Sequence, residues 1–183
     1  ATPGDGGNVT VRAGDRNSGL GISGHMHGGN GGDQADGCGN QNGGCGGDIT
    51  LAGQPFIVHG SDQNVFPTLT GGQAGLDSDG TRGNCGGAGP TTLLIDPSDI
   101  EINGAKMAAD GIVIFGGTNW TMALTDTATG MISATQGITL AVGTGGSIDL
   151  RGCEAGAFTA PRFFVASDNV LLDAGQTLAD VVS

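Results

Sequence analysis

The sequence predicts an all-β protein built as a parallel β-solenoid, and three observations lead to that fold class. A short phrase of two apolar residues around one central residue recurs along the chain, as at Asp48–Leu51, Gly137–Leu140 and Ser147–Leu150. Alternate side chains of a strand point to opposite faces, so both apolar residues of a phrase share one face. Glycine supplies 39 of 183 residues and leaves no segment suited to a long helix. Turn residues such as Asn103-Gly104 separate the phrases at short intervals.

The phrases define the predicted strands in chain order. In the N-terminal half they cover residues 8–11, 48–51, 55–58 and 64–69, and the glycine-rich segments 13–47 and 71–90 are predicted as loops. From residue 91 the strands become regular, and we expect them at 93–95, 100–102, 112–115, 120–124, 131–133, 138–142, 148–150, 163–165 and 170–172. The best helical window, 104–109, is only about one and a half turns long. Residues 1–183 are expected to form a single all-β domain.

The likeness among the phrases favours stacked coils, because identical faces can then bury one continuous apolar column. A β-sandwich or jelly roll is the alternative, since strands at short spacing suit it as well. The expected column consists of Ile100, Ile102, Ile112, Ile114, Ile138, Leu140, Ile148 and Leu150. Trp120 has the same strand parity as Met122 and Leu124, which predicts a place in the core or at a subunit interface.

Three segments share a similar repeat pattern of apolar and polar residues. They are Leu-Leu-Ile-Asp-Pro-Ser-Asp-Ile-Glu-Ile at 93–102, Met-Ile-Ser-Ala-Thr-Gln-Gly-Ile-Thr-Leu-Ala-Val at 131–142, and Gly-Ser-Ile-Asp-Leu-Arg-Gly at 146–152. Over about residues 91–175 this pattern resembles the repeats of filamentous-haemagglutinin-type secreted adhesins. The resemblance implies a right-handed parallel β-helix exported to a bacterial surface. The 13–47 segment departs from it. That family builds very long chains, so this short chain would form a long object only by polymerising.

Charge and hydropathy narrow the function classes. The formal charge is −12, from 18 acidic and six basic residues, and this argues against nucleic acid as a partner. No stretch of ~18 apolar residues is present, so the chain is not expected to span a membrane. It opens Ala-Thr-Pro-Gly without an initiator Met, which suits a processed, secreted protein at the cell surface or outside the cell.

Four cysteines support the same compartment, because an even count in a glycine-rich, acidic chain is typical of disulfide-bonded secreted proteins. They are Cys38, Cys45, Cys85 and Cys153, and three pairings are open. The favoured pairing joins Cys38 with Cys45 in a small loop and Cys85 with Cys153 across the chain.

No bound cofactor is expected, and calcium is the alternative that one pattern suggests. Residues 28–36 overlay the Gly-Gly-x-Gly-x-Asp nonapeptide whose stacked turns bind Ca²⁺, with Asp33 and Asp36 as ligands, although only one copy is present. Asp77 and Asp79 form a second acidic turn.

Two other patterns offer candidate surface sites. His25 and His27 would lie on one side of a strand and, with His59 or a thiolate, would provide zinc or copper ligands. Asn8 and Asn119 open N-glycosylation triplets.

No catalytic arrangement emerges from the sequence, because the six basic residues are scattered and no Gly-x-Ser-x-Gly motif occurs. The expected function is a structural subunit that binds copies of itself, since neither end of the chain shows a polar cap. The alternative is a monomeric module that binds carbohydrate or ice through an array of threonines such as Thr10, Thr50 and Thr139. A polysaccharide-degrading β-helix enzyme is the third hypothesis.

Overall fold

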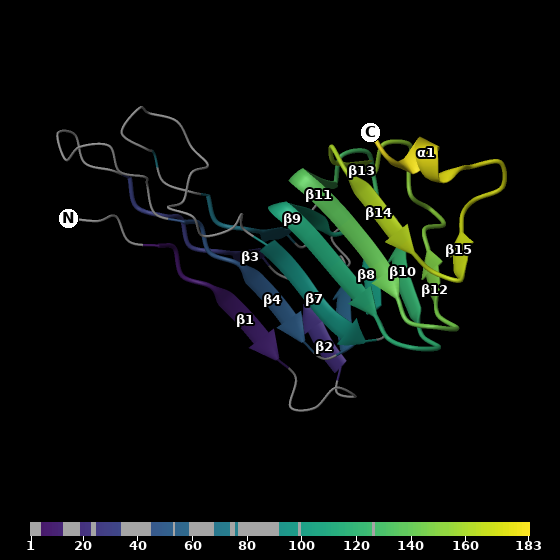
Figure 1. Ribbon diagram of the computed structural model, residues 1–183, viewed down its shortest axis with the longest axis horizontal. Coiled ribbons are helices and arrows are strands. Elements are labelled where there is room, and N and C mark those ends of the chain that lie inside the picture. Colours follow the sequence, from purple (N-terminus) through teal and green to yellow (C-terminus); the bar gives the residue numbers. More distant parts are fainter. Residues whose placement is uncertain are drawn as a thin grey trace.

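The computed structural model describes residues 5–12, 19–22, 25–33, 45–52, 54–58, 68–73, 76, 92–98, 100–125 and 127–183. In these residues every strand pair is parallel, and strands far apart in sequence stack as successive coils of a β-solenoid (Figure 1). The predicted fold class is therefore confirmed. Each coil has three faces.

The three faces account for all the described strands. The first face holds β1 (Val9–Arg12), β4 (Ile49–Ala52), β7 (Thr92–Ser98), the second halves of β9 (Lys106–Gly116) and β11 (Ile132–Val142), and β14 (Phe163–Ala166). The second face holds β2 (Gly19–Ile22), β5 (Gln54–Val58), β8 (Ile100–Asn103), β10 (Thr121–Thr125), β12 (Ser147–Asp149) and β15 (Asn169–Leu171). The third holds β3 (His25–His27), β6 (Thr68–Thr70), the first halves of β9 and β11, and β13 (Phe158–Thr159).

Strands β9 and β11 turn a corner without a break. Met107 of β9 pairs with β6 on the third face, whereas Ile112 pairs with β7 on the first. A register shift between Ala134 and Gly137 lets β11 make the same bend beside β9. The first and third faces are therefore parts of one nine-stranded sheet, and the second face is a separate six-stranded sheet.

The core is a single apolar column inside the coils. All eight residues expected to form it are buried, and none is more than 2% exposed. The column runs from Ile49 to Val181 and includes Met122 and Leu124. Trp120 lies outside this cluster: it is half-buried just before β10, with its ring against Gly117. It therefore covers a corner of the solenoid rather than filling its interior.

Two local features differ from the sequence predictions. Residues 13–47, predicted as a loop, contain β2 and β3, which are formed by pairing with strands of the next coil. The window at 104–109, which is too short for a long helix, contains the start of β9, paired with β6. The C-terminus, predicted to stay strand-like, forms a short helix, α1 (Leu178–Val181).

Candidate functional site

Both ends of the solenoid leave core side chains partly uncovered. Inward-facing Val9, Val11 and Met26 in the first coil are half-buried, as are Phe163 and Val165 in the last. Their neighbours one coil further in, such as Ile49 and Leu140, are fully buried. Among the described residues the apolar column is thus fully covered in its middle coils and only partly covered in its first and last coils.

The last coil also has an unpaired strand edge. Among the described residues β14 pairs only with β11, and β15 only with β12. The N–H of Ile138 donates to the carbonyl of Arg162 at 2.9 Å, which fixes the hydrogen-bonding phase of β14. Bonds alternate between the two sides of a parallel strand, so the N–H groups of Phe163 and Val165 face away from β11. A further strand could pair there.

The third side of the last coil is closed by the chain terminus. The carboxylate of Asp180 accepts hydrogen bonds from the N–H and hydroxyl of Thr177, both at 2.7 Å, and these bonds hold the first turn of α1 and lower the pKa of Asp180. Val181 is buried, and Ser183 N–H donates to Phe158 O at 2.8 Å. This short helix completes the coil and leaves Val165 half-exposed.

Four glycine-rich segments lie side by side where the third face of an N-terminal coil leads into the first face. They are residues 5–8, 28–33, 45–48 and 71–73 with 76, and we call them the glycine array. Gly29 N–H donates to Gly7 O at 2.9 Å, Gly47 N–H to Gly29 O at 2.8 Å, and Gly72 N–H to Gly47 O at 2.9 Å. Because a Cβ at Gly47 would overlap the carbonyl of Gly7, only glycine permits this approach.

Polar side chains fasten the array at intervals of three residues. Asn30 Oδ1 accepts the N–H of Gln73 at 3.0 Å, and Asp33 Oδ1 accepts the N–H of Leu76 at 2.9 Å. Asp5 and Asn8 make the same bonds to residues 45 and 48, both at 2.9 Å. A three-residue period is typical of extended polyproline-II-type chains, which have no internal hydrogen bonds and must bond sideways. The order of this region therefore comes from backbone contacts between coils.

The array changes the interpretation of the calcium candidate. Asp33 holds a backbone N–H of the next coil, so at least one of its oxygens has a structural role. Asp36, Asp77 and Asp79 lie outside the described residues, and within the described part no cluster of three or more metal-ligating side chains occurs. His25 and His27 are both exposed on β3, on the same side, as the alternation predicts. His25 Nδ1 lies 2.7 Å from Thr68 Oγ1, His27 Nδ1 contacts Gly28 O, and His59 is not among the described residues.

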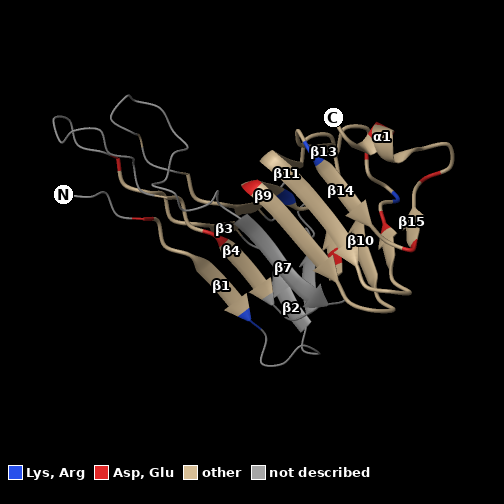
Figure 2. Ribbon diagram, in the orientation of Figure 1, with Lys and Arg blue, Asp and Glu red and all other residues tan. Residues whose placement is uncertain are grey.

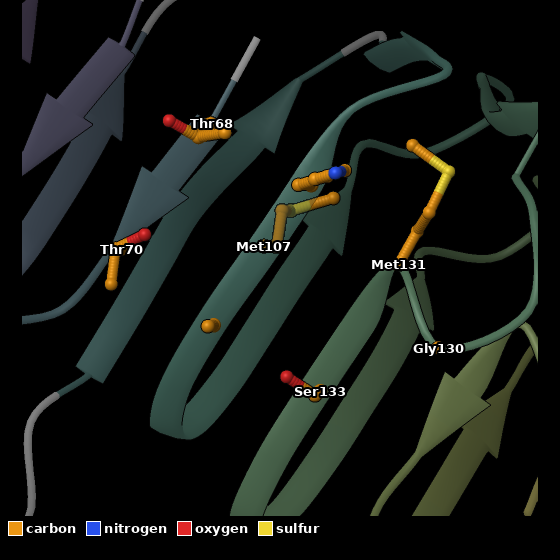
Figure 3. Close-up of a pocket in the computed structure, with 8 residues that line it drawn as sticks. Thr68, Thr70, Met107, Gly130, Met131 and Ser133 are labelled. Atoms are coloured by element: carbon orange, nitrogen blue, oxygen red, sulfur yellow. The ribbon is translucent and has the colours of Figure 1, made fainter. Parts of the chain in front are cut away.

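A shallow hollow of about 230 Å³ lies on the third face, across β6, β9 and β11 (Figure 3). Thr68 and Thr70 line it from β6 and Ser133 from β11, and Met131 lies at its edge beside Gly130. Its lining contains a single ionisable side chain, Lys106, so the hollow does not bring an acid and a base together.

Cys153 is a buried thiol. Its Sγ–H donates to the carbonyl of Leu124 at 3.0 Å, and burial raises the pKa of the thiol to about 11. The structure forms no bond between Cys153 and a second sulfur, so the pairing with Cys85 is absent from it. Cys45 is buried in the glycine array. Cys38 and Cys85 lie outside the described residues, and the Cys38–Cys45 pairing stays a prediction.

Two further features lie on the surface: the two glycosylation triplets and an ion pair on the second face. Asn8 and Asn119 are both exposed, so glycosylation at either triplet stays a prediction; Asn119 takes a left-handed conformation in its turn, with φ of 59°. On the second face Arg151 pairs with Asp149 at 2.6 Å, and this hydrogen-bonded contact lowers the pKa of Asp149.

The threonines proposed for a flat binding array lie in one register row of the first face. The register runs Thr10, Thr50, Leu94, Val113, Thr139 and Phe164. Half of the six positions are apolar, so the row is not a regular threonine array. A lattice-matching surface needs that regularity.

No family model matches the chain, and comparisons with curated proteins and with solved structures found no match either. No helix in the described residues is long and apolar enough to cross a bilayer. The fold class accordingly rests on the strand pairing itself.

Proposed function

We propose that this protein is a secreted structural subunit that stacks end to end into an extracellular filament or surface fibre, with an adhesive or matrix role. The observation that carries the proposal is the open apolar column at both ends of the described coils. Half-buried Val9 and Val11 at one end, and Phe163 and Val165 at the other, are the side chains that a further coil would cover.

The parallel strands make such stacking geometrically simple. Every strand of one face runs in the same direction, so the first coil of one copy can follow the last coil of another without reversing the chain. This contact is heterologous, and heterologous contacts that do not close into a ring produce filaments. The likeness to filamentous-haemagglutinin-type adhesin repeats supports an extracellular role for the assembled fibre.

The test is electron microscopy and sedimentation of the native, non-reduced protein with and without a block at the last coil. Val165→Pro removes an N–H that faces the open edge, and proline on an edge strand prevents strand addition. Val165→Ala loses the same apolar side chain but keeps the N–H, so it is the matched control. We expect filaments from the wild type, less stable filaments from the alanine variant, which loses part of the apolar end surface, and single particles from the proline variant.

Circular dichroism and thermal melting of both variants would establish that each is folded. A wild-type protein that stays monomeric at high concentration would overturn the proposal. It would then favour the alternative, a monomeric module that binds carbohydrate through a solenoid face.

A further inference from the structure

Two large apolar side chains stand exposed on the outside of the first face. Phe115 of β9 is 37% exposed and Phe164 of β14 is 60% exposed. Both have the outward parity of their strands, since Ile114 is buried and Phe163 and Val165 pack against the core. Burying such rings stabilises by about 1.5–3 kcal/mol each, so a partner that covered this face would gain stability from both.

The rings belong to a grid of six outward residues on three adjacent strands, which we call the phenylalanine grid. One row is Val113, Thr139 and Phe164; the other is Phe115, Ala141 and Ala166. The two phenylalanines occupy opposite corners, and small residues fill the positions between them. None of the six is charged, in a chain whose formal charge is −12. Figure 2 shows the same stretches of β9, β11 and β14 without acidic or basic residues.

This diagonal arrangement is self-complementary. If a second copy faces the grid with its strands antiparallel, the two rows exchange, and Phe115 lies over Val113 while Phe164 lies over Ala166. Thr139 then lies over Ala141. Each ring meets a smaller side chain of the other copy. Large side chains opposite small ones allow two sheets to interdigitate at a spacing of about 10 Å.

The distribution of charged residues also favours a second copy of the chain as the partner, with its strands antiparallel. Copies of an acidic chain repel one another, so they can approach closely only through an uncharged surface. Arg162 is exposed two residues before Phe164, and Asp168 is exposed two residues after Ala166. With antiparallel strands the Arg162 end of one copy lies near the Asp168 end of the other, and their charges are opposite.

From these observations we infer that the phenylalanine grid is an isologous interface between two copies of this chain, packed side by side. It is distinct from the end-to-end contact, which covers inward side chains: Phe115 lies in the fourth coil, and Phe164, although it lies in the last coil, points outward. Side-by-side pairing would join two strings of subunits into a doubled fibre.

The test is Phe115→Arg, alone and with Phe164→Arg, compared with Thr121→Arg on the exposed second face. Each change adds one positive charge to an acidic protein and so lowers the repulsion between copies. Loss of pairing therefore cannot come from a larger net charge on the protein. We expect Phe115→Arg to weaken dimerisation by more than about tenfold, because an interface must then desolvate a guanidinium without a partner. Thr121→Arg should leave it unchanged.

The readout works whether or not the ends stack. If filaments form, the wild type should have twice the mass per unit length of the Phe115→Arg variant; if none form, the wild type should be a discrete dimer and the variant a monomer. A failure of end-to-end stacking is thus distinguishable from a failure of this interface. Equal mass per length, or equal particle mass, in folded wild type and double variant would overturn the inference.

Discussion

The N-terminal coils, up to residue 76, and the C-terminal coils, from residue 100, pass the corner between the third and first faces in different ways. In the C-terminal part β9 and β11 bend through it directly, and contacts between successive coils, such as Thr135 to Asp110, span 25 residues. In the N-terminal part the chain detours through the glycine array, where the contacts Asn8 to Asp48 and Asn30 to Gln73 span 40 and 43 residues. The stack of strands continues unchanged despite this difference.

The comparison shows two sources of order in one solenoid. The C-terminal coils rely on apolar side chains stacked in register, which gain stability by leaving water. The glycine array buries almost no apolar surface and relies on lateral backbone hydrogen bonds, each worth about 1 kcal/mol net. Ordering glycine costs more conformational entropy than ordering any other residue, so the array depends on the coils beside it.

The largest effect is expected from breaking the apolar column. Leu140 is fully buried and lies in register between Ile114 and Val165. Leu140→Ala should lower the free energy of unfolding by about 2–5 kcal/mol, since it leaves a cavity that rigid sheets cannot close. Urea denaturation measures this change. Gln136→Ala, at an exposed position of the same strand, should stay within about 0.5 kcal/mol. Equal losses for the two variants would contradict the column as the main source of stability.

A smaller and more local effect is expected in the glycine array. Gly47→Ala places a methyl group against the carbonyl of Gly7, and the resulting overpacking should cost about 1–3 kcal/mol. Gly7→Ala is the matched control, because a Cβ there meets nothing within 4 Å. Hydrogen exchange should show faster exchange at Gly29 and Gly72 in the first variant, with the amides of β11 and β12 unaffected.

The location of the change decides what it means. Faster exchange confined to the array would establish that the two halves open independently. Faster exchange throughout both sheets in Gly47→Ala would show instead that the array and the C-terminal coils unfold as one unit.

The last effect depends on pH, and it tests whether the thiol of Cys153 is shielded from water in the folded protein. Its folded pKa of about 11 lies above the ordinary value of ~8.5, so the fold favours the neutral thiol. That contribution is fully present below pH ~8.5 and is lost as the pH rises toward 11. With reductant present, the stability of the wild type should fall relative to Cys153→Ala over this range. Parallel pH profiles of the two proteins would contradict the assigned burial effect.

Much of the fold could be predicted because strand alternation is a local signal. The phrases at 48–51, 112–115 and 148–150 identified β4, the first-face part of β9, and β12, together with the side chains that point inward. Helix α1 was missed, since Leu178 and Val181 are too few apolar residues to distinguish a single helical turn from a strand. The outward parity of Phe115 and Phe164 was readable from the same alternation, but only the register brings them into one grid.

The glycine array could not be predicted from hydrophobic pattern, because its order comes from contacts between segments at least 18 residues apart. A signal was nevertheless present. A Gly-Gly pair followed by a polar residue recurs at 6–8, 28–30, 31–33, 46–48 and 71–73. This triplet has the same three-residue interval as the side-chain bonds of the array, and its polar residue is the one whose side chain or N–H bonds the next segment.

The one-sided detour of the glycine array has a consequence for any end-to-end assembly. The second face stacks six described strands, and at ~4.8 Å per coil one subunit would occupy about 29 Å of axial length. The glycine array extends only from the first two coils. The cross-section of each subunit is therefore wider at its N-terminal end than at its C-terminal end. A stacked fibre would therefore have a visible direction and a projection recurring about every 29 Å, a spacing that appears as a layer line in its diffraction pattern.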